Sequence, residues 1–129
     1  MDPPRLVLQF PAVADQVPPA RHTVRAYAAQ HGACDPHAVA LALSEAVSNA
    51  VLHAYADAPE PGDVEVVAQR FADDGLKVVV CDAGSGMKPR PDSPGLGAGL
   101  ALIGALADGV RVEARPGGGT RVAMSFAAA

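Results

Sequence analysis

Three polar residues, Glu45, Asn49 and His53, are spaced four residues apart in the otherwise apolar segment LALSEAVSNAVLHAY (41–55). Residues at i, i+4 and i+8 of an α-helix lie near one another along one face. Asn49 could hold Mg²⁺, which usually takes one or two protein oxygens together with substrate phosphates. Glu45, one turn earlier, could accept a proton from a water or a hydroxyl group. A solvated edge of a surface helix, with His53 as a packing or capping residue, explains the same pattern.

A second polar motif follows an apolar stretch in VVVCDAGSG (78–86), where Asp82 is followed by Gly84 and Gly86. A carboxylate at a strand end can accept a hydrogen bond from an exocyclic amine. The glycines would let a flat ring approach the backbone. An ordinary Asp/Gly turn is the alternative interpretation.

A third motif, GLGAGLALI (95–103), is a glycine-rich segment that opens a helix. Free backbone N–H groups and the positive end of a helix can together hold phosphate. The segment lacks the Lys-Ser/Thr of a P-loop, and its glycine spacing differs from the dinucleotide fingerprint. No βαβ unit surrounds it, which argues against a Rossmann fold. A flexible loop with a helix cap explains the same residues, and a related GGGT run (117–120) comes later.

The elements that must position these motifs can be read from hydrophobic periodicity, prolines and glycines. Apolar residues at spacings of three and four indicate the long helix. A short DDG loop between β-rich segments indicates a hairpin. The expected elements are a strand at 5–10, a helix at about 18–31, a helix at 36 to about 56, strands at 63–72 and 76–83, a helix at 100–108, and strands at 109–116 and 118–126.

This order predicts one α+β domain. Strands grouped in pairs favour a mixed, mostly antiparallel sheet with its helices on one face, a two-layer sandwich. The chain of 129 residues is long enough for one hydrophobic core. The Gly- and Pro-rich segment 84–99 is longer than most connections in compact domains, so we expect it to be a mobile functional loop.

Composition limits the classes of function. The formal net charge of −4 leaves no broad basic surface, which argues against non-specific nucleic-acid binding. Cys34 and Cys81 are too few for a disulfide scaffold and lack metal-ligand spacing, so we expect buried free thiols in a reducing cytoplasm. The apolar part of segment 1–11 is too short for a signal sequence or a membrane span. We therefore expect a soluble intracellular protein that does not bind membranes.

Taken together and in this order, the motifs resemble the GHKL superfamily of ATP-binding domains. That superfamily includes histidine kinases, gyrase-type topoisomerases, Hsp90-type chaperones and MutL-type repair proteins. EAVSNAVLH (45–53) is similar to its N box, DAGSG (82–86) to its G1 box, GAGLAL (97–102) to its G2 box, and GGGTRV (117–122) to its terminal threonine motif. The resemblance covers nearly the whole chain and implies a Bergerat-type ATP-binding fold.

Within that superfamily the chain most resembles the small stand-alone anti-sigma-factor serine/threonine kinases of bacteria. The short length, the segment SEAVSNAVLHAY (44–55) and the preceding RHTVRAYAAQHG (21–32) carry this likeness. It implies ATP and Mg²⁺ as cofactors, and a sigma factor and a STAS-type anti-anti-sigma factor as partners. It also implies a homodimer formed through strand 5–10 or through the first helix.

The resemblance also implies a role for each motif. Glu45 would be the catalytic base toward the serine of the partner, Asn49 would hold Mg²⁺, and Asp82 would bind the adenine amino group. The glycines after Asp82 would shape the adenine pocket. The implied nucleotide-binding residues are Asn49, His53, Asp82, Gly84, Gly86, Met87, Gly97, Gly99, Leu100 and Thr120.

Residues 97–100 and Thr120 have more specific implied roles. Gly97, Gly99 and Leu100 would close over the phosphates, and Thr120 would support the base beside Asp82. The lid would run from 87 to 98.

Four basic residues are further candidates for contacts with ligands or partners. Lys88 and Arg90 in the lid could reach phosphate oxygens, although solvated loop charges explain both as well. Arg21 and Arg25 share a helical face and could contact a partner protein, or could form an ordinary solvated face.

A second functional class stays open. A non-catalytic ATP-binding module could sequester a regulatory partner without transferring phosphate, because phosphoryl transfer depends on positioning that motifs alone do not establish. A histidine kinase fragment is disfavoured because no His lies on an upstream helical hairpin. A gyrase- or Hsp90-type hydrolase is disfavoured because the sequence offers no transducer domain.

Overall fold

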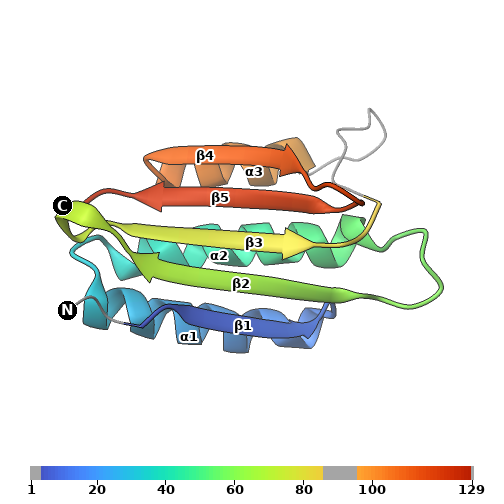
Figure 1. The fold of residues 1–129 in the computed structure, drawn as a ribbon, viewed down its shortest axis with the longest axis horizontal. Helices are drawn as coiled ribbons and strands as arrows, with labels where there is room; N and C mark the ends of the chain where they lie inside the picture. Colours follow the sequence, from blue (N-terminus) through green and yellow to red (C-terminus); the bar gives the residue numbers. More distant parts are fainter. Residues whose placement is uncertain (1–3, 86–95, 129) are drawn as a thin grey trace.

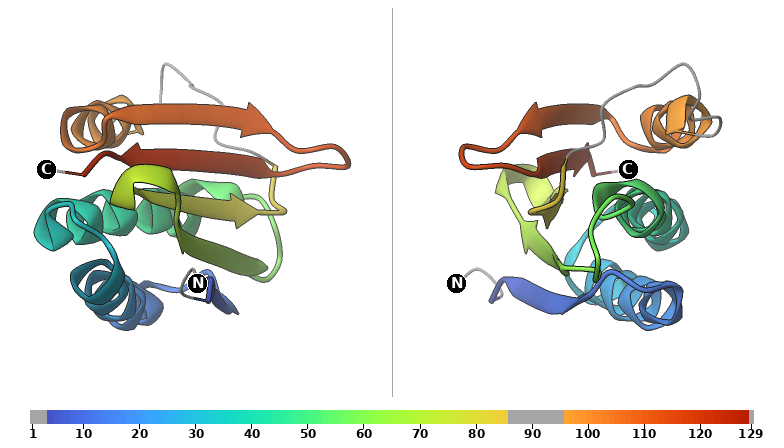
Figure 2. Two further views of the ribbon diagram at one scale, coloured as in Figure 1. Left: turned by 60° about the vertical axis from the view of Figure 1, so that its left-hand side comes forward. Right: turned by 90° about the vertical axis from the view of Figure 1, so that its right-hand side faces the viewer.

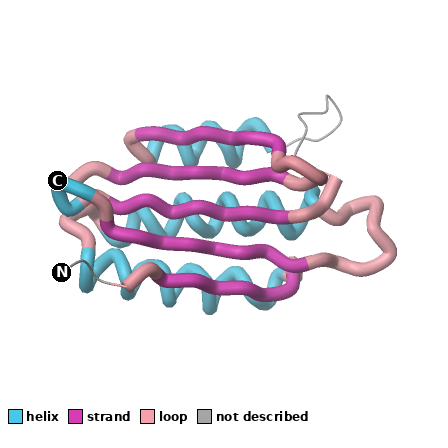
Figure 3. Tube along the Cα trace, in the orientation of Figure 1, coloured by secondary structure: helices cyan, strands magenta, loops and turns pink. Residues whose placement is uncertain are grey.

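The computed structural model of the chain describes residues 4–85 and 96–128. Its helices and strands form two layers, which confirms the predicted α+β sandwich (Figure 1). Figure 3 marks the same helices and strands along the Cα trace. The elements are β1 (Leu6–Pro11), α1 (Val17–His31), α2 (Pro36–Asn49), a π-helical segment (Ala50–Ala54), β2 (Asp63–Arg70), β3 (Leu76–Asp82), α3 (Leu96–Leu106), β4 (Gly109–Ala114) and β5 (Thr120–Phe126).

The five strands form one sheet in the order β1-β2-β3-β5-β4. Every neighbouring pair of described strands is antiparallel, so the expected parallel component of a mixed sheet is absent from this part of the chain. The three α-helices cover one face of the sheet, and the views in Figure 2 leave the other face uncovered. The prediction of helices on a single face is therefore confirmed.

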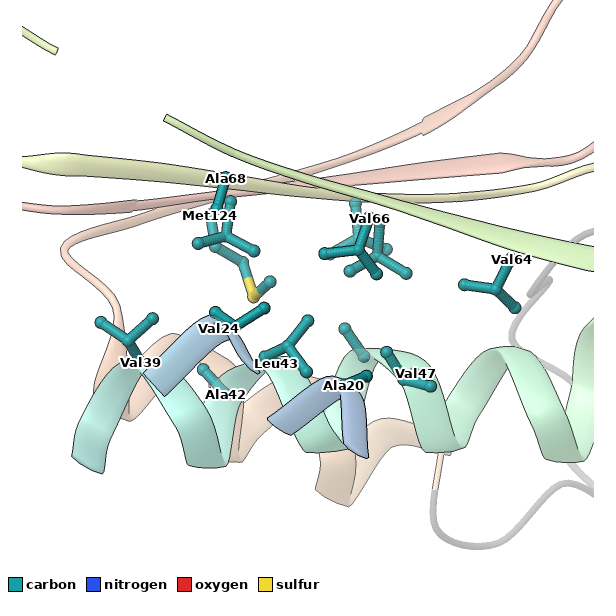
Figure 4. Packing of buried hydrophobic residues seen from close by; sticks show 14 of the residues in the cluster. Ala20, Val24, Val39, Ala42, Leu43, Val47, Val64, Val66, Ala68 and Met124 are labelled. Carbon is teal, nitrogen blue, oxygen red and sulfur yellow. The ribbon is translucent and has the colours of Figure 1, made fainter. Parts of the chain in front are cut away.

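Strict alternation of side chains builds the core between the two layers. In β2, for example, Val64, Val66 and Ala68 are fully buried, while the residues between them face the uncovered side. Figure 4 shows these side chains meeting Leu43 and Val47 from α2. Full burial of each Val or Leu side chain contributes about 1.5–3 kcal/mol relative to an exposed position.

The second helix differs from its prediction. We expected one α-helix from 36 to about 56, but regular α geometry ends at Asn49 and a π-helical segment follows. No Gly or Pro lies between 37 and 58, so nothing in the local sequence indicates this change. The Ser85 N–H donates to the Ala54 carbonyl over 2.9 Å, and we attribute the wider turn to this contact with the segment after β3.

The third helix begins earlier than predicted. We expected residues 100–108, whereas α3 spans Leu96–Leu106. Gly97 and Gly99 therefore lie in helical turns and not in a loop before the helix. Two glycines lower helix propensity, but small residues allow α3 to approach α2 closely, and this tertiary contact outweighs local propensity. The rest of the expected loop, residues 86–95, lies outside the described residues.

Both predicted hairpins are present, with strands somewhat shorter than expected. Between β2 and β3 the chain turns through Asp73 and Asp74, which have φ values of 67° and 62°. Between β4 and β5 the chain turns through the glycines of residues 117–119, which have φ values of 84°, 114° and 102°. These left-handed conformations suit glycine, and Asp tolerates them better than most residues.

Candidate functional site

Helix α2 positions the first two polar residues of the site. Its start is fixed by Asp35, whose carboxylate accepts a hydrogen bond of 2.9 Å from the His37 N–H, with Pro36 at the first helical position. Glu45 and Asn49 lie one α-helical turn apart near the other end. Asn49 is only 4% exposed, whereas Glu45 is partly buried.

The carboxamide of Asn49 has an unusual environment. Its Nδ2 atom is buried and has no hydrogen-bond partner among the described residues. A buried polar group without a partner costs about 1–3 kcal/mol, and such groups are rare unless they serve a purpose. An amide held in this way is available to a group that the protein itself does not supply.

Gly99 brings α3 against these two side chains. A Cβ atom at Gly99 would lie 3.1 Å from Asn49 Nδ2, 3.2 Å from Asn49 Oδ1 and 3.4 Å from Glu45 Oε2. The glycine backbone thus faces both polar groups at close range. Sequence analysis placed these three residues in one site, and the structure brings them together across 54 positions of the chain.

Asp82 lies at the end of β3, as predicted, and is only 2% exposed. Burial raises the pKa of its carboxyl group. The backbone N–H groups of Gly84 and Thr120 and the positive charge of Arg115 act in the opposite direction on this pKa. The Gly84 N–H donates to Asp82 Oδ1 over 3.0 Å. Thr120 is the cross-strand neighbour of Asp82 in β5 and is also buried.

The glycine after β3 joins this carboxylate to the end of the second helix. A Cβ atom at Gly84 would clash with the backbone carbonyl of Ala54, so no side chain fits there. In Figure 1 the C-terminal ends of β3 and α2 lie at the same end of the molecule. The carboxylate of Asp82 and the polar edge of α2 therefore belong to one region.

Two residues of this region were missed by sequence analysis. The Tyr55 hydroxyl donates to the Asp63 carbonyl over 2.7 Å and accepts from the Ala83 N–H over 2.9 Å, which fixes the backbone next to Asp82. Arg115 donates from Nη1 to the Asp82 carbonyl over 2.7 Å. The position of Tyr55 just after the N box was an available signal, whereas no sequence pattern indicated Arg115.

The remaining predicted site residues have varied positions. His53 lies in the π-helical segment, so it does not continue the α-helical stripe as expected, and its side chain forms no hydrogen bond or ion pair with the described residues. Leu100 is partly buried against the hydrophobic core. Gly97 lies in the first turn of α3. Gly86, Met87, Lys88 and Arg90 lie outside the described residues.

Other features lie apart from this region. Two hollows of about 450 and 270 Å³ occupy the uncovered face of the sheet, where Lys77 and Arg121 line both, and neither includes a residue of the candidate site. Arg21 and Arg25 are exposed on α1. Within residues 4–85 and 96–128, no cluster of three His, Cys, Asp or Glu side chains could hold a metal ion.

The two cysteines are free thiols, as predicted, but each is only partly buried. Burial raises the pKa of both Cys34 and Cys81 above the ordinary thiol value. Both thiols are therefore protonated at neutral pH, which lowers their reactivity. In the described part of the chain, no helix has the length and apolar content needed to cross a lipid bilayer.

The fold and the site define an α+β sandwich with buried polar side chains on α2 and at the end of β3, and with α3 packed against those of α2. A profile described as "Histidine kinase-like ATPase domain" matches residues 10–126. The chain belongs to this family.

Curated relatives match two thirds or more of the chain. It is 31% identical to an anti-sigma F factor of Clostridium acetobutylicum, over 93% of this chain and 91% of the relative. It is 32% identical to an anti-sigma F factor of Pasteuria penetrans, over 93% and 88% of the two chains. It is 33% identical to an anti-sigma F factor of Clostridium novyi, over 67% and 66%.

Proposed function

We propose that this protein is an anti-sigma regulator that binds ATP and Mg²⁺ and transfers the γ-phosphoryl group to a serine or threonine hydroxyl of a partner. The observation that carries the proposal is the group formed by Glu45, the unpartnered buried amide of Asn49, and Gly99. Family membership supports the ATP site. The name shared by the relatives, anti-sigma F factor, supports the regulatory part.

At the adenine end, the carboxylate of Asp82 would accept a hydrogen bond from the exocyclic amino group. Its burial supports this role, because a hydrogen bond is stronger in a low-dielectric environment than in water. Gly84 lets the segment after β3 pack directly against the Ala54 backbone, which fixes the backbone beside Asp82. Thr120, directly across from Asp82, would line the same pocket.

At the phosphate end, Asn49 would hold Mg²⁺ through its amide oxygen, and the ion would neutralise phosphate charge when bound. The residues fit this role, because Mg²⁺ needs only one or two protein oxygens, and the unpartnered Nδ2 group of the same amide could donate to a phosphate oxygen. The N-terminal turn of α3 carries Gly97 and Gly99, and free N–H groups there favour anions. His53 and Met87 remain proposed members of the nucleotide site.

In the transfer step, Glu45 would accept the proton of the partner hydroxyl. The hydroxyl oxygen forms a bond to the γ-phosphorus, the bond from that phosphorus to the bridging oxygen breaks, and ADP leaves. Such transfer depends mainly on positioning and on stabilisation of charge. Glu45 fits the task, because its Oε2 atom lies beside Gly99 and next to the proposed metal ligand.

The proposed partners are a sigma factor and a STAS-type anti-anti-sigma factor that carries the phosphorylated residue. Arg21 and Arg25 are exposed on α1 and would offer positive charge to an acidic partner surface. A homodimer through β1 or α1 is part of the same proposal. β1 is an edge strand whose outer backbone groups are available for pairing.

The test is phosphate transfer from γ-labelled ATP to a purified STAS-domain protein from the same organism. We expect labelling of that protein by the wild type, no labelling by Glu45→Gln, and unchanged ATP binding by Glu45→Gln. Glu65→Gln is the matched control, because Glu65 is an exposed acid on the uncovered face of the sheet and should leave transfer intact. ATP binding without transfer by the wild type would instead support a sequestering module that lacks kinase activity.

A further inference from the structure

The side chain of Arg115 reaches from the β4–β5 turn into the candidate nucleotide site. Its Nη1 atom donates to the backbone carbonyl of Asp82 over 2.7 Å, a short distance for a charge-assisted hydrogen bond. The turn itself is held by two backbone hydrogen bonds, from the Arg115 N–H to the Gly119 carbonyl and from the Gly118 N–H to the Arg115 carbonyl. Arg115 is thus tied to Asp82 from a defined backbone position.

Gly119 permits this approach. Its φ of 102° is a left-handed conformation that favours glycine, and a Cβ atom there would clash with the Asp82 carbonyl oxygen. The turn therefore lies directly against the end of β3. Replacement of the glycine by any other residue would push the turn, and the guanidinium group with it, away from Asp82.

The positive charge of Arg115 also acts on the neighbouring carboxylate. Burial raises the pKa of the Asp82 carboxyl group; the backbone N–H groups of Gly84 and Thr120 lower it most, and Arg115 is the charged side chain among the described residues that lowers it further. The other elements around Asp82 present uncharged groups. These are the Gly84 N–H after β3, Thr120 of β5, Val64 of β2, and the Tyr55 hydroxyl, which is already bonded to two backbone groups.

The protonation state of this carboxyl group matters for base recognition. An ionised carboxylate only accepts hydrogen bonds, whereas a protonated carboxyl group also donates one. Adenine presents an amino donor on its six-position, and guanine presents an oxygen acceptor there. An ionised Asp82 that faces the six-position therefore accepts from the adenine amino group and repels the guanine oxygen, whereas a protonated one could donate to that oxygen.

We propose that Arg115 is a positioning residue of the nucleotide site, which holds the end of β3 and places a positive charge near the Asp82 carboxyl group, so that this group is favoured as a hydrogen-bond acceptor for adenine. This inference rests on the proposed ATP site at Asp82. It assigns a function to a residue outside the motifs that carry the family resemblance. It also accounts for the glycine at position 119, where the turn lies against the Asp82 carbonyl.

The test compares wild type, Arg115→Met, Arg115→Lys and Arg111→Ala by calorimetric titration with ATP and with GTP from pH 5 to pH 8. Arg111→Ala removes the same charge from an exposed position on β4, where Arg111 faces Glu113 at 3.4 Å. For Arg115→Met we expect about tenfold weaker ATP binding at pH 7, which equals ~1.4 kcal/mol. We also expect a smaller preference for ATP over GTP.

The pH profile separates positioning from a general structural role. ATP affinity should fall as the pH drops through the pKa of Asp82, and this fall should begin at a higher pH in Arg115→Met. Arg115→Lys should restore the wild-type profile, and Arg111→Ala should match the wild type. A loss of affinity in Arg115→Met that is equal at every pH, or wild-type behaviour of this variant, contradicts the inference. Absence of ATP binding by the wild type would instead overturn the proposed function.

Discussion

The close approach of Gly99 to Asn49 and Glu45 gives a direct test of the phosphate end of the site. In the substitution Gly99→Ala, the new methyl group would lie 3.1–3.4 Å from the amide and carboxylate atoms. Favourable contacts between heavy atoms need about 3.5–4.0 Å, so the Asn49 side chain must move by a few tenths of an ångström. Gly104→Ala in the same helix is the matched control, because a Cβ atom there meets nothing within 4 Å.

The two substitutions should have different effects on stability and on binding. Ala in place of Gly within a helix stabilises by about 0.5–1 kcal/mol, and Gly104→Ala should gain this in full. At Gly99 the displacement of the buried Asn49 amide should cancel most of the gain. Because this displacement moves the amide away from the position in which it would meet the bound nucleotide, we expect Gly99→Ala to lose about tenfold in affinity for ATP with Mg²⁺, which equals ~1.4 kcal/mol.

Urea denaturation measures the first effect, and calorimetric titration with ATP and Mg²⁺ measures the second. A double-mutant cycle with Asn49→Ala sharpens the test, because the added methyl group should matter less once the amide is gone. If Gly99→Ala binds ATP as tightly as the wild type and Gly104→Ala do, the proposed geometry of the phosphate end is wrong.

Three further predictions concern the adenine end. Tyr55→Phe removes a hydroxyl that joins two backbone groups, and it should lower the free energy of unfolding by about 1–3 kcal/mol in urea denaturation. Gly119→Ala should lower the free energy of unfolding by roughly 2–4 kcal/mol, because it combines backbone strain with a clash against Asp82. Gly117→Ala has open space around the new methyl group and should lower it by only about 1–2 kcal/mol. Equal losses in the two variants would contradict this reasoning. The raised pKa of the Asp82 carboxyl group means that the folded protein binds this proton more tightly than the unfolded chain does. The ionised carboxylate therefore lowers the free energy of unfolding at neutral pH. This loss disappears as the pH falls through the pKa of the folded state and then that of the unfolded state. Urea titrations should therefore show the stability of the wild type rising relative to Asp82→Asn as the pH is lowered from 7 to 3, and a falling difference would contradict the assigned direction.

Much of the fold could be predicted because it depends on local pattern. Alternating apolar residues marked the strands, and the Asp35-Pro36 pair marked the start of α2. Short turns with Asp or Gly joined β2 to β3 and β4 to β5. The order of strands was not accessible in this way, because hairpin pattern fixes which strands pair locally and leaves open that β5 lies between β3 and β4.

The features that sequence analysis missed depend on contacts distant in sequence. The π-helical turn after Asn49 has no Gly or Pro to indicate it, and it coincides with the hydrogen bond between Ser85 and Ala54. The early start of α3 runs against the low helix propensity of glycine, and it depends on packing against α2. Arg115 joined the site only because its long side chain crosses from a turn to the end of β3.

The proposed site residues were found by a different route. Each motif alone had an ordinary structural explanation, such as a solvated helix edge or an Asp/Gly turn. Their common order along the chain favoured one nucleotide site over these separate explanations. The structure brings Glu45, Asn49 and Gly99 together at the end of the molecule where β3 ends at Asp82.

The most direct measurement is calorimetric titration of the purified protein with ATP, with and without Mg²⁺, beside the variants Asn49→Ala and Asp82→Asn. We predict that the wild type binds ATP, that Mg²⁺ strengthens this binding only when Asn49 is present, and that Asp82→Asn weakens it under both conditions. Absence of ATP binding by the wild type, or binding that neither variant changes, would contradict a nucleotide site between α2, α3 and the end of β3.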